Sequence, residues 1–195
     1  MRQAQIDRKT RETNIHLALD LDGTGKSSVD TGVGFLDHML ELMSFHSGMD
    51  LTVRCQGDTR VDDHHSVEDI GIALGQALRE ALGDKKGIRR YGNFLLPMDE
   101  ALVLCAIDLS GRDTLGYQVS LPMEKVGSFD TELVKEFMLA FVRNAQACLH
   151  FKQLAGENTH HIIEAMFKGL GRALRQAVQI DPDRAGETPS SKGVL

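Results

Sequence analysis

The chain has 195 residues, of which 42% are hydrophobic and 26% charged, and its formal net charge is −6. These values are typical of an ordinary globular protein, and the negative balance disfavours a nucleic-acid or anionic-membrane partner. No apolar run approaches the ~18 residues of a membrane span, and the three cysteines lie in apolar stretches, which predicts reduced thiols in a cytoplasmic protein.

The first half of the chain predicts alternating strands and helices. Apolar and polar residues alternate from Ile15 to Leu21, which indicates a strand with one buried face, and the glycine-rich turn after it favours a hairpin. The expected elements are strands over 3–7, 15–21 and 27–31, a helix over 35–43, a strand over 49–55 and a helix over 63–82. The strand over 27–31 is expected to be the hairpin partner of 15–21.

The second half repeats this order. Its expected elements are strands over 102–109 and 115–121, a helix over 133–142, a strand over 147–151 and a helix over 158–178. Asn158 is a good N-cap residue for the last helix, and the tail after Asp181 is expected to be a loop. Each half therefore reads β-β-α-β-α. We expect an α+β protein of two duplicated half-domains, 1–88 and 89–195, each a small mixed sheet with helices on one face, together forming one compact unit.

The motif His-His-x-x-Glu occurs twice, at 64–68 and at 160–164, 96 residues apart. The match continues downstream, where Leu74-Gly75 returns as Leu170-Gly171. Identities at one constant separation indicate an internal duplication of this helix. A single His-His pair is usually a surface or capping feature, but packing alone gives no reason to duplicate the glutamate as well.

Helix geometry divides the duplicated residues between two metal ions. Residues i and i+4 share a helix face, so His64 can bind an ion together with Glu68, whereas neighbours differ by about 100°. The second histidine of each motif must then serve a different ion. The two expected sites comprise His64, Glu68 and His161, and His160, Glu164 and His65. Histidine and carboxylate ligands suit Mn, Fe, Zn or Co.

The helix before each motif is expected to supply a further ligand. His38 lies in the first of these helices, and Glu136 is its counterpart in the second. Asp69 has no copy in the second motif, so we expect it to be solvated or to support a ligand.

Two short motifs suggest other chemistry. Gly25-Lys26-Ser27 resembles the end of a phosphate-binding P-loop, but the first glycine of that loop and the following helix are missing. Asp20-Leu21-Asp22-Gly23-Thr24 resembles the nucleophile motif of haloacid-dehalogenase-type phosphatases. Those enzymes need a parallel sheet, and the second half has lost the second acid, so we do not favour this interpretation.

Longer motifs at 32–40, 63–69, 97–101, 108–112, 160–168 and 190–193 resemble those of the imidazoleglycerol-phosphate dehydratase family. The resemblance covers nearly the whole chain. It implies half-domains of the ribosomal protein S5 domain 2-like type, and the loss of water from imidazole-glycerol phosphate in histidine biosynthesis. It also implies two Mn²⁺ ions per active site and a homo-oligomer of about 24 chains with sites between subunits.

The resemblance assigns roles to individual residues. His38 joins the site that holds His65, His160 and Glu164. Many members have histidine where this chain has Glu136, and His150 is an alternative ligand there. Glu12 matches an acid near the reacting carbons and is the expected acid–base catalyst, with metal-bound water as the alternative. The residues expected around the substrate and its phosphate are Glu12, Arg90, Arg112, Lys168, Ser190, Ser191 and Lys192.

Two other functions use the same ligands. One is a dinuclear hydrolase of phosphate esters, and the other is a non-catalytic metal-binding assembly. Arg112 and the tail with Lys192 argue against simple storage, because storage needs no phosphate site.

Overall fold

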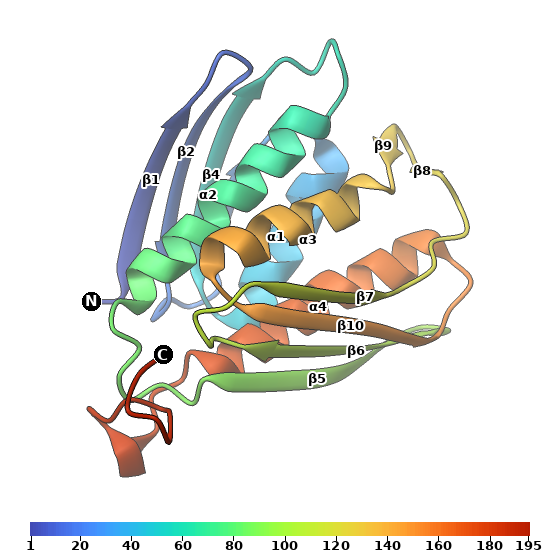
Figure 1. Ribbon diagram of the computed structural model, residues 1–195. Coiled ribbons are helices and arrows are strands. Elements are labelled where there is room, and N and C mark those ends of the chain that lie inside the picture. The colour runs from blue at the N-terminus through green and yellow to red at the C-terminus, as the bar shows by residue number, and fades with distance from the viewer.

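A computed structural model describes residues 1–195 and shows two four-stranded sheets with four helices between them (Figure 1). The first half contains β1 (Gln3–Lys9), β2 (Thr13–Asp20), β3 (Ser27–Asp30), α1 (Gly34–Ser47), β4 (Asp50–Gly57) and α2 (His64–Leu82). The second contains β5 (Tyr91–Met98), β6 (Ala101–Asp108), β7 (Thr114–Gln118), α3 (Leu133–Ala145), β10 (Cys148–Ala155) and α4 (Thr159–Ala177). None of the helices is long and apolar enough to cross a membrane.

The two halves have the same topology. Their strand orders are β1-β2-β4-β3 and β5-β6-β10-β7, and each sheet carries its two helices on one face. The apolar side of each strand faces these helices, so the two helical layers meet in one continuous core. The expected α+β fold of two duplicated half-domains is confirmed.

The expected hairpins are wrong in both halves. β3 pairs with β4 in parallel, Ser27 opposite Leu51, and β7 pairs with β10 in the same way. A parallel pair needs a crossover, and α1 provides it between β3 and β4. The turn after β2 is tied to the start of β4, because the Asp50 carboxylate accepts hydrogen bonds from the backbone N–H groups of Thr24 (2.7 Å) and Lys26 (2.8 Å).

Each half begins with one more strand than the β-β-α-β-α pattern contains. β1 was expected, but β5 was not. β5 includes Pro97, which has no N–H to donate, and it lies at the edge of its sheet, where proline is tolerated. A two-stranded hairpin, β8 (Lys125–Val126) and β9 (Phe129–Asp130), is inserted before α3 in the second half only.

The closest helix pairs join the two halves: α2 packs against α3, and α1 packs against α4. The duplicated glycines make these crossings close. A Cβ on Gly75 would lie 2.5 Å from the Phe141 carbonyl oxygen, and one on Gly171 would lie 2.7 Å from that of Met43. The Leu-Gly repeat is therefore a packing requirement of the interface between halves.

Candidate metal centre

Three predicted ligands come together where α1 meets α4. His160 Nε2 lies 3.1 Å from Glu164 Oε2, and His38 Nε2 lies 3.9 Å from the same oxygen. Donor atoms of these three residues all lie within 4.8 Å of one another, and no other group of three such residues in the chain does so. Two imidazoles and a carboxylate in this arrangement can bind one transition-metal ion.

Local folding places these side chains. The Asn158 side chain caps α4 by accepting a hydrogen bond from the His161 backbone N–H (3.2 Å), so the His-His pair occupies the first turn. Glu164 follows one turn later on the same face as His160. The Asp37 carboxylate accepts a hydrogen bond from the Thr31 backbone N–H (2.9 Å), which fixes the start of α1 next to His38.

Glu164 is a buried carboxylate with a cation beside it. Burial alone would raise its pKa, but Lys168 and His160 outweigh burial, so the pKa of Glu164 is lowered. Lys168 Nζ lies 2.5 Å from Glu164 Oε1. Glu164 is therefore held ionised, with Oε2 directed at the histidines. Lys168, expected near the substrate, lies beside this cluster.

The first copy of the motif forms a more open pair. His64 Nε2 lies 3.8 Å from Glu68 Oε2, and both side chains are about two-fifths exposed (41% and 45%). These two residues share a helix face, as the i and i+4 spacing requires. Within one chain they have no third ligand close by.

The second histidine of each motif forms a hydrogen bond from its Nδ1 to a carboxylate. His65 Nδ1 donates to Asp58 (3.0 Å), and His161 Nδ1 donates to Glu100 (2.7 Å). These hydrogen bonds raise the pKa of each histidine, and the bond from His161 is the largest cause that lowers the pKa of Glu100 to about 2. Nε2 of each ring is left free to bind a metal.

Glu12 lies beside His65. Its Oε1 is 3.8 Å from His65 Nε2, and its side chain is about half exposed (52%). Glu100, 88 residues later, contacts Nδ1 of His161 instead, and the acid near Nε2 of that ring is Asp99 (3.7 Å). The structure therefore brings the expected catalytic acid next to an expected metal ligand.

Other expected ligands are not brought together within one chain. His65 does not join His160 and Glu164, and His161 does not join His64 and Glu68. Glu136 lies in the first turn of α3, half-buried, at the position that His38 occupies in α1. His150 lies exposed on β10. These assignments stay predictions.

Asp69 is not solvated. It is buried under β1 and β2, where it accepts hydrogen bonds from Arg8 Nη2 (2.8 Å) and from the Thr13 hydroxyl (2.5 Å). These two partners tie α2 to the first sheet. Asp69 therefore has a structural contact network of its own.

The residues expected to bind phosphate lie at the other end of the second half. Arg90 forms a two-bond ion pair with Asp108, and its Nη1 donates to the Pro189 carbonyl (3.0 Å). Ser190 follows directly, and its hydroxyl accepts a hydrogen bond from the Lys192 backbone N–H (3.2 Å). Arg112 is exposed next to Gly111, which lies beside the chain's last residue.

The expected metal ligands and phosphate residues are separated by the length of α4. His160 lies in its first turn, whereas Ala177 at its end accepts a hydrogen bond from the Arg90 backbone N–H. At 1.5 Å per residue these positions are roughly 25 Å apart along the helix axis. Figure 1 shows the same separation: the C-terminal tail and the beginning of α4 lie on opposite sides of the molecule.

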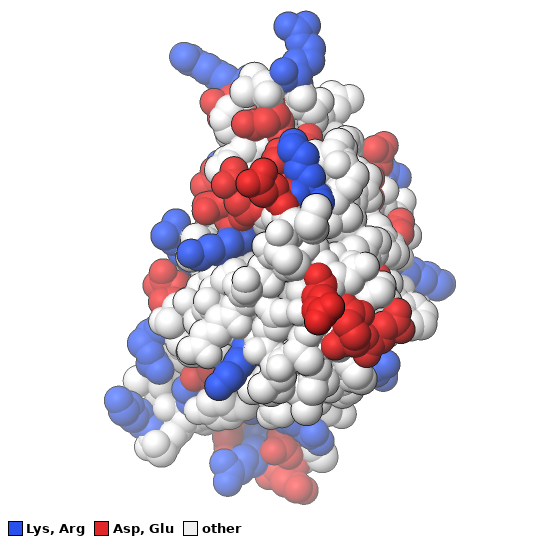
Figure 2. All heavy atoms as spheres, turned by 90° about the vertical axis from the view of Figure 1, so that its right-hand side faces the viewer, with Lys and Arg blue, Asp and Glu red and all other residues white.

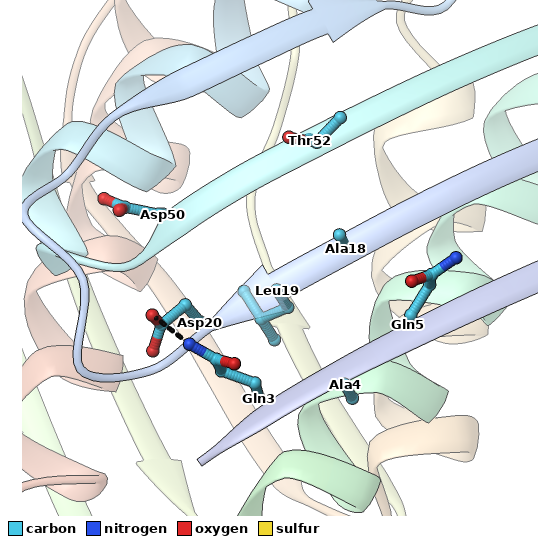
Figure 3. Close-up of a pocket in the computed structure, with 8 residues that line it drawn as sticks. All are labelled: Gln3, Ala4, Gln5, Ala18, Leu19, Asp20, Asp50 and Thr52. Carbon is cyan, nitrogen blue, oxygen red and sulfur yellow. Dashed lines mark hydrogen bonds between the residues drawn. The ribbon is translucent and has the colours of Figure 1, made fainter. Parts of the chain in front are cut away.

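The surface of the molecule also carries acidic groups and a groove. Acidic side chains on the face shown in Figure 2 gather in two groups, and such groups attract cations. A groove on the outer face of the first sheet contains none of the expected site residues (Figure 3). Its acids have structural partners: Asp20 accepts a hydrogen bond from Gln3 (2.7 Å), and Asp50 holds the turn after β2.

Comparison with known proteins identifies the family. A sequence profile described as imidazoleglycerol-phosphate dehydratase matches residues 31–174. The chain is 56% identical over 194 residues to the imidazoleglycerol-phosphate dehydratase of Prochlorococcus marinus (strain NATL1A), covering all of this chain and 96% of that one. It is 58% identical over 195 residues to that of Jannaschia sp. (strain CCS1), with both chains fully covered. The chain belongs to the imidazoleglycerol-phosphate dehydratase family.

Solved imidazoleglycerol-phosphate dehydratase structures have the same fold. The Staphylococcus aureus subsp. aureus N315 structure matches with a TM-score of 0.84 and 46% identity, over 92% of this chain and 99% of that one. The Pyrococcus furiosus structure, in complex with (S)-C348, matches with a TM-score of 0.84 and 41% identity, over 97% and 100%. As an imidazoleglycerol-phosphate dehydratase family member, the chain is a hydro-lyase of histidine biosynthesis.

The sequence analysis did not predict the carboxylates that accept hydrogen bonds from His65 and His161. Asp58 lies in the loop before α2, and Glu100 lies in the turn before β6, so neither is part of the duplicated helix. One signal was available. Glu12 and Glu100 are 88 residues apart, the same separation that relates β2 to β6, so the duplication extends to this acid.

Proposed function

We propose that the chain converts D-erythro-imidazole-glycerol phosphate to imidazole-acetol phosphate and water, using two Mn²⁺ ions per active site. The observation that carries this proposal is the cluster of His38, His160 and Glu164, together with the second motif pair, His64 and Glu68. Family membership supplies the substrate class.

The residues fit manganese. Both ligand groups offer imidazole nitrogen and carboxylate oxygen, and no cysteine takes part, which suits Mn²⁺ rather than a soft metal. Glu164 is ionised and aimed at the two histidines, so it needs no rearrangement to bind a cation. His38, His160 and Glu164 would hold one ion, and His64 and Glu68 would help to hold the other; such ions would supply Lewis-acid stabilisation of negative charge on the substrate's imidazole.

Glu12 is the proton-transfer residue in this proposal. The hydrogen removed from the substrate carbon has no neighbouring carbonyl, so a positioned base is needed to accept it. Glu12 is exposed enough to meet a substrate and lies beside His65. Arg112, Ser190, Ser191 and Lys192 offer charge and hydrogen-bond donors for the phosphate.

We propose that each active site is shared between chains. A substrate with three carbons between its ring and its phosphate cannot span the length of α4. The metal ligands and the phosphate-binding residues of one active site must therefore come from two copies of the chain. Exposed Tyr91, Leu95 and Leu154 on the second sheet give an apolar surface for such contacts. A symmetric assembly of about 24 chains, and a cytoplasmic location, stay predictions.

One experiment tests the function. Purified protein is analysed for bound metal and assayed with imidazole-glycerol phosphate, with and without a chelator. Dehydration should give the ketone product without inorganic phosphate, and the chelator should abolish it until Mn²⁺ is restored. Release of inorganic phosphate would instead indicate a hydrolase, and bound metal without turnover would indicate a storage assembly.

A further inference from the structure

The C-terminal tail, residues 181–195, is held by the linker between the two halves. Gly87 exchanges backbone hydrogen bonds with it, donating to Glu187 (2.8 Å) and accepting from Asp181 (2.7 Å). Closer to the expected phosphate-binding residues, the tail is held by a side chain. Arg90 Nη1 donates to the Pro189 carbonyl (3.0 Å), the residue just before Ser190.

Asp108 fixes the direction of the Arg90 side chain. Its Oδ1 accepts from Arg90 Nε (2.7 Å), and its Oδ2 accepts from Arg90 Nη2 (3.1 Å). Both side chains are largely buried, with exposed fractions of 12% for Arg90 and 23% for Asp108. A guanidinium bound along one edge by a carboxylate is fixed in a plane, and the remaining nitrogen, Nη1, then points at the tail.

The internal duplication shows that this arrangement is specific to the second half. Arg2 lies 88 residues before Arg90, and the carbonyl groups of both accept a hydrogen bond from the corresponding leucine N–H, Leu21 or Leu109. Arg2, however, pairs with Asp22 and contacts the end of α4. Ser110 stands where Asp22 stands in the first half, so Arg90 has lost that partner and pairs with Asp108 instead.

We propose that Asp108 is a positioning residue for phosphate binding: through Arg90 it anchors the tail so that Ser190, Ser191 and Lys192 are presented to the substrate phosphate. This inference rests on the proposed function, because it takes the tail as the phosphate-binding segment. The tail also ends beside Gly111, so it lies against the loop that contains Arg112, another residue expected to bind the phosphate.

The test compares Asp108→Asn with Asp22→Asn, which breaks the ion pair of Arg2, the counterpart of Arg90, in the half that has no tail. Asp108→Asn should raise KM for imidazole-glycerol phosphate about tenfold with kcat within about threefold, because an anchor for phosphate affects substrate and transition state alike. Trypsin cleavage at Arg184 and Lys192 should become faster as the tail is released. Asp22→Asn should change neither quantity, and Asp108→Glu should restore most of the tail protection.

The outcomes separate the anchor from the function. If Asp108→Asn leaves both KM and the rate of tail cleavage at wild-type values, the proposed role of Asp108 is wrong. If Lys192→Ala leaves KM unchanged, the tail does not bind phosphate and that part of the proposed function fails, while faster cleavage in Asp108→Asn still supports the anchor. Should Asp108→Asn not fold, Arg90→Lys takes its place. It keeps the charge but cannot reach Asp108 and Pro189 together, so unchanged cleavage in that variant also contradicts the anchor.

Discussion

At the scale of single residues, the site is built from histidines whose two ring nitrogens have different tasks. Asp58 and Glu100 take the Nδ1 hydrogens of His65 and His161, and so fix the tautomer that exposes Nε2. A fixed tautomer holds the ring in one orientation with Nε2 as the nitrogen available to a metal, which favours metal binding. These carboxylates are therefore expected to matter for metal affinity although they touch no ion.

Replacing Glu100 tests this expectation. Glu100→Ala removes the partner of His161 Nδ1, and the affinity for Mn²⁺ should fall roughly 10- to 100-fold. The measurement is a titration of metal-free protein with Mn²⁺. Glu157→Ala is the control, since Glu157 is an exposed neighbouring acid without a histidine contact. Equal affinities for the two variants would contradict the role of Glu100.

Glu12 allows a sharper test of the chemistry. Glu12→Gln keeps the size of the side chain but removes the base, so kcat should fall about 10²- to 10⁴-fold while Mn²⁺ binding stays unchanged. Steady-state turnover and metal content measure the two quantities separately. Turnover near that of the wild type would exclude Glu12 as the proton-transfer residue.

The duplicated ligands could be predicted from sequence because helix geometry is local. The i and i+4 spacing places Glu164 on the face of His160, and the structure shows this contact directly. Asp58 and Glu100 could not be placed, since their contacts depend on how two loops fold over the starts of α2 and α4. The contact of Asp69 with Arg8 was missed because the two residues are distant in sequence and meet only where α2 packs against β1.

At the scale of elements, hydrophobic periodicity found the helices and most strands, but it did not find how the strands pair. β3 is mostly exposed and β7 is half-exposed, and a strand of this kind after a turn fits a hairpin as well as a parallel edge. What decides the pairing is the crossover through α1 or α3, a property of the packed half-domain. The buried and exposed positions of β5 alternate regularly, but its residue types do not follow them. Gly92 is buried while Leu95 is exposed, and the strand contains Pro97, so hydrophobic periodicity did not reveal it.

The glycines at the helix crossings give a prediction at this scale. Gly171→Ala places a Cβ against the backbone of α1, so unfolding should become easier by about 2 kcal/mol. Gly34→Ala is the matched control, because a Cβ there meets nothing within 4 Å. Chemical denaturation measures both. A Gly171→Ala protein as stable as Gly34→Ala would mean that α1 and α4 can separate at no cost.

At the scale of the whole molecule, the separation of metal ligands from phosphate residues predicts complementation between subunits. Glu164→Gln damages the expected metal-binding region, and Lys192→Ala damages the expected phosphate-binding region at the far end of α4. Each variant alone should have low activity, but chains unfolded together and reassembled should regain about a quarter of wild-type activity, since one site in four combines the two intact ends. Light scattering shows whether the reassembled chains reach the mass of the wild-type assembly, and the recovered activity itself reports that the two kinds of chain have mixed.

The control is a mixture of two variants damaged at the same end, Glu164→Gln with His160→Ala. These chains should show no recovery, because no combination of subunits restores an intact cluster. Recovery in this control, or none in the first mixture, would mean that each site belongs to a single chain.

The crossed packing of α1 on α4 and α2 on α3 also bears on how this chain arose. α1 packs against α4, which is the counterpart of α2, and α2 packs against α3, which is the counterpart of α1. Gly75 and Gly171 lie at matching points of these two contacts. This is the geometry of a two-fold symmetric dimer, in which one surface recognises itself. A half-length ancestor with the same helices would have formed this core by self-association. Within one fused chain the two halves need not be identical, and the tail that contacts Arg90 belongs to the second half only.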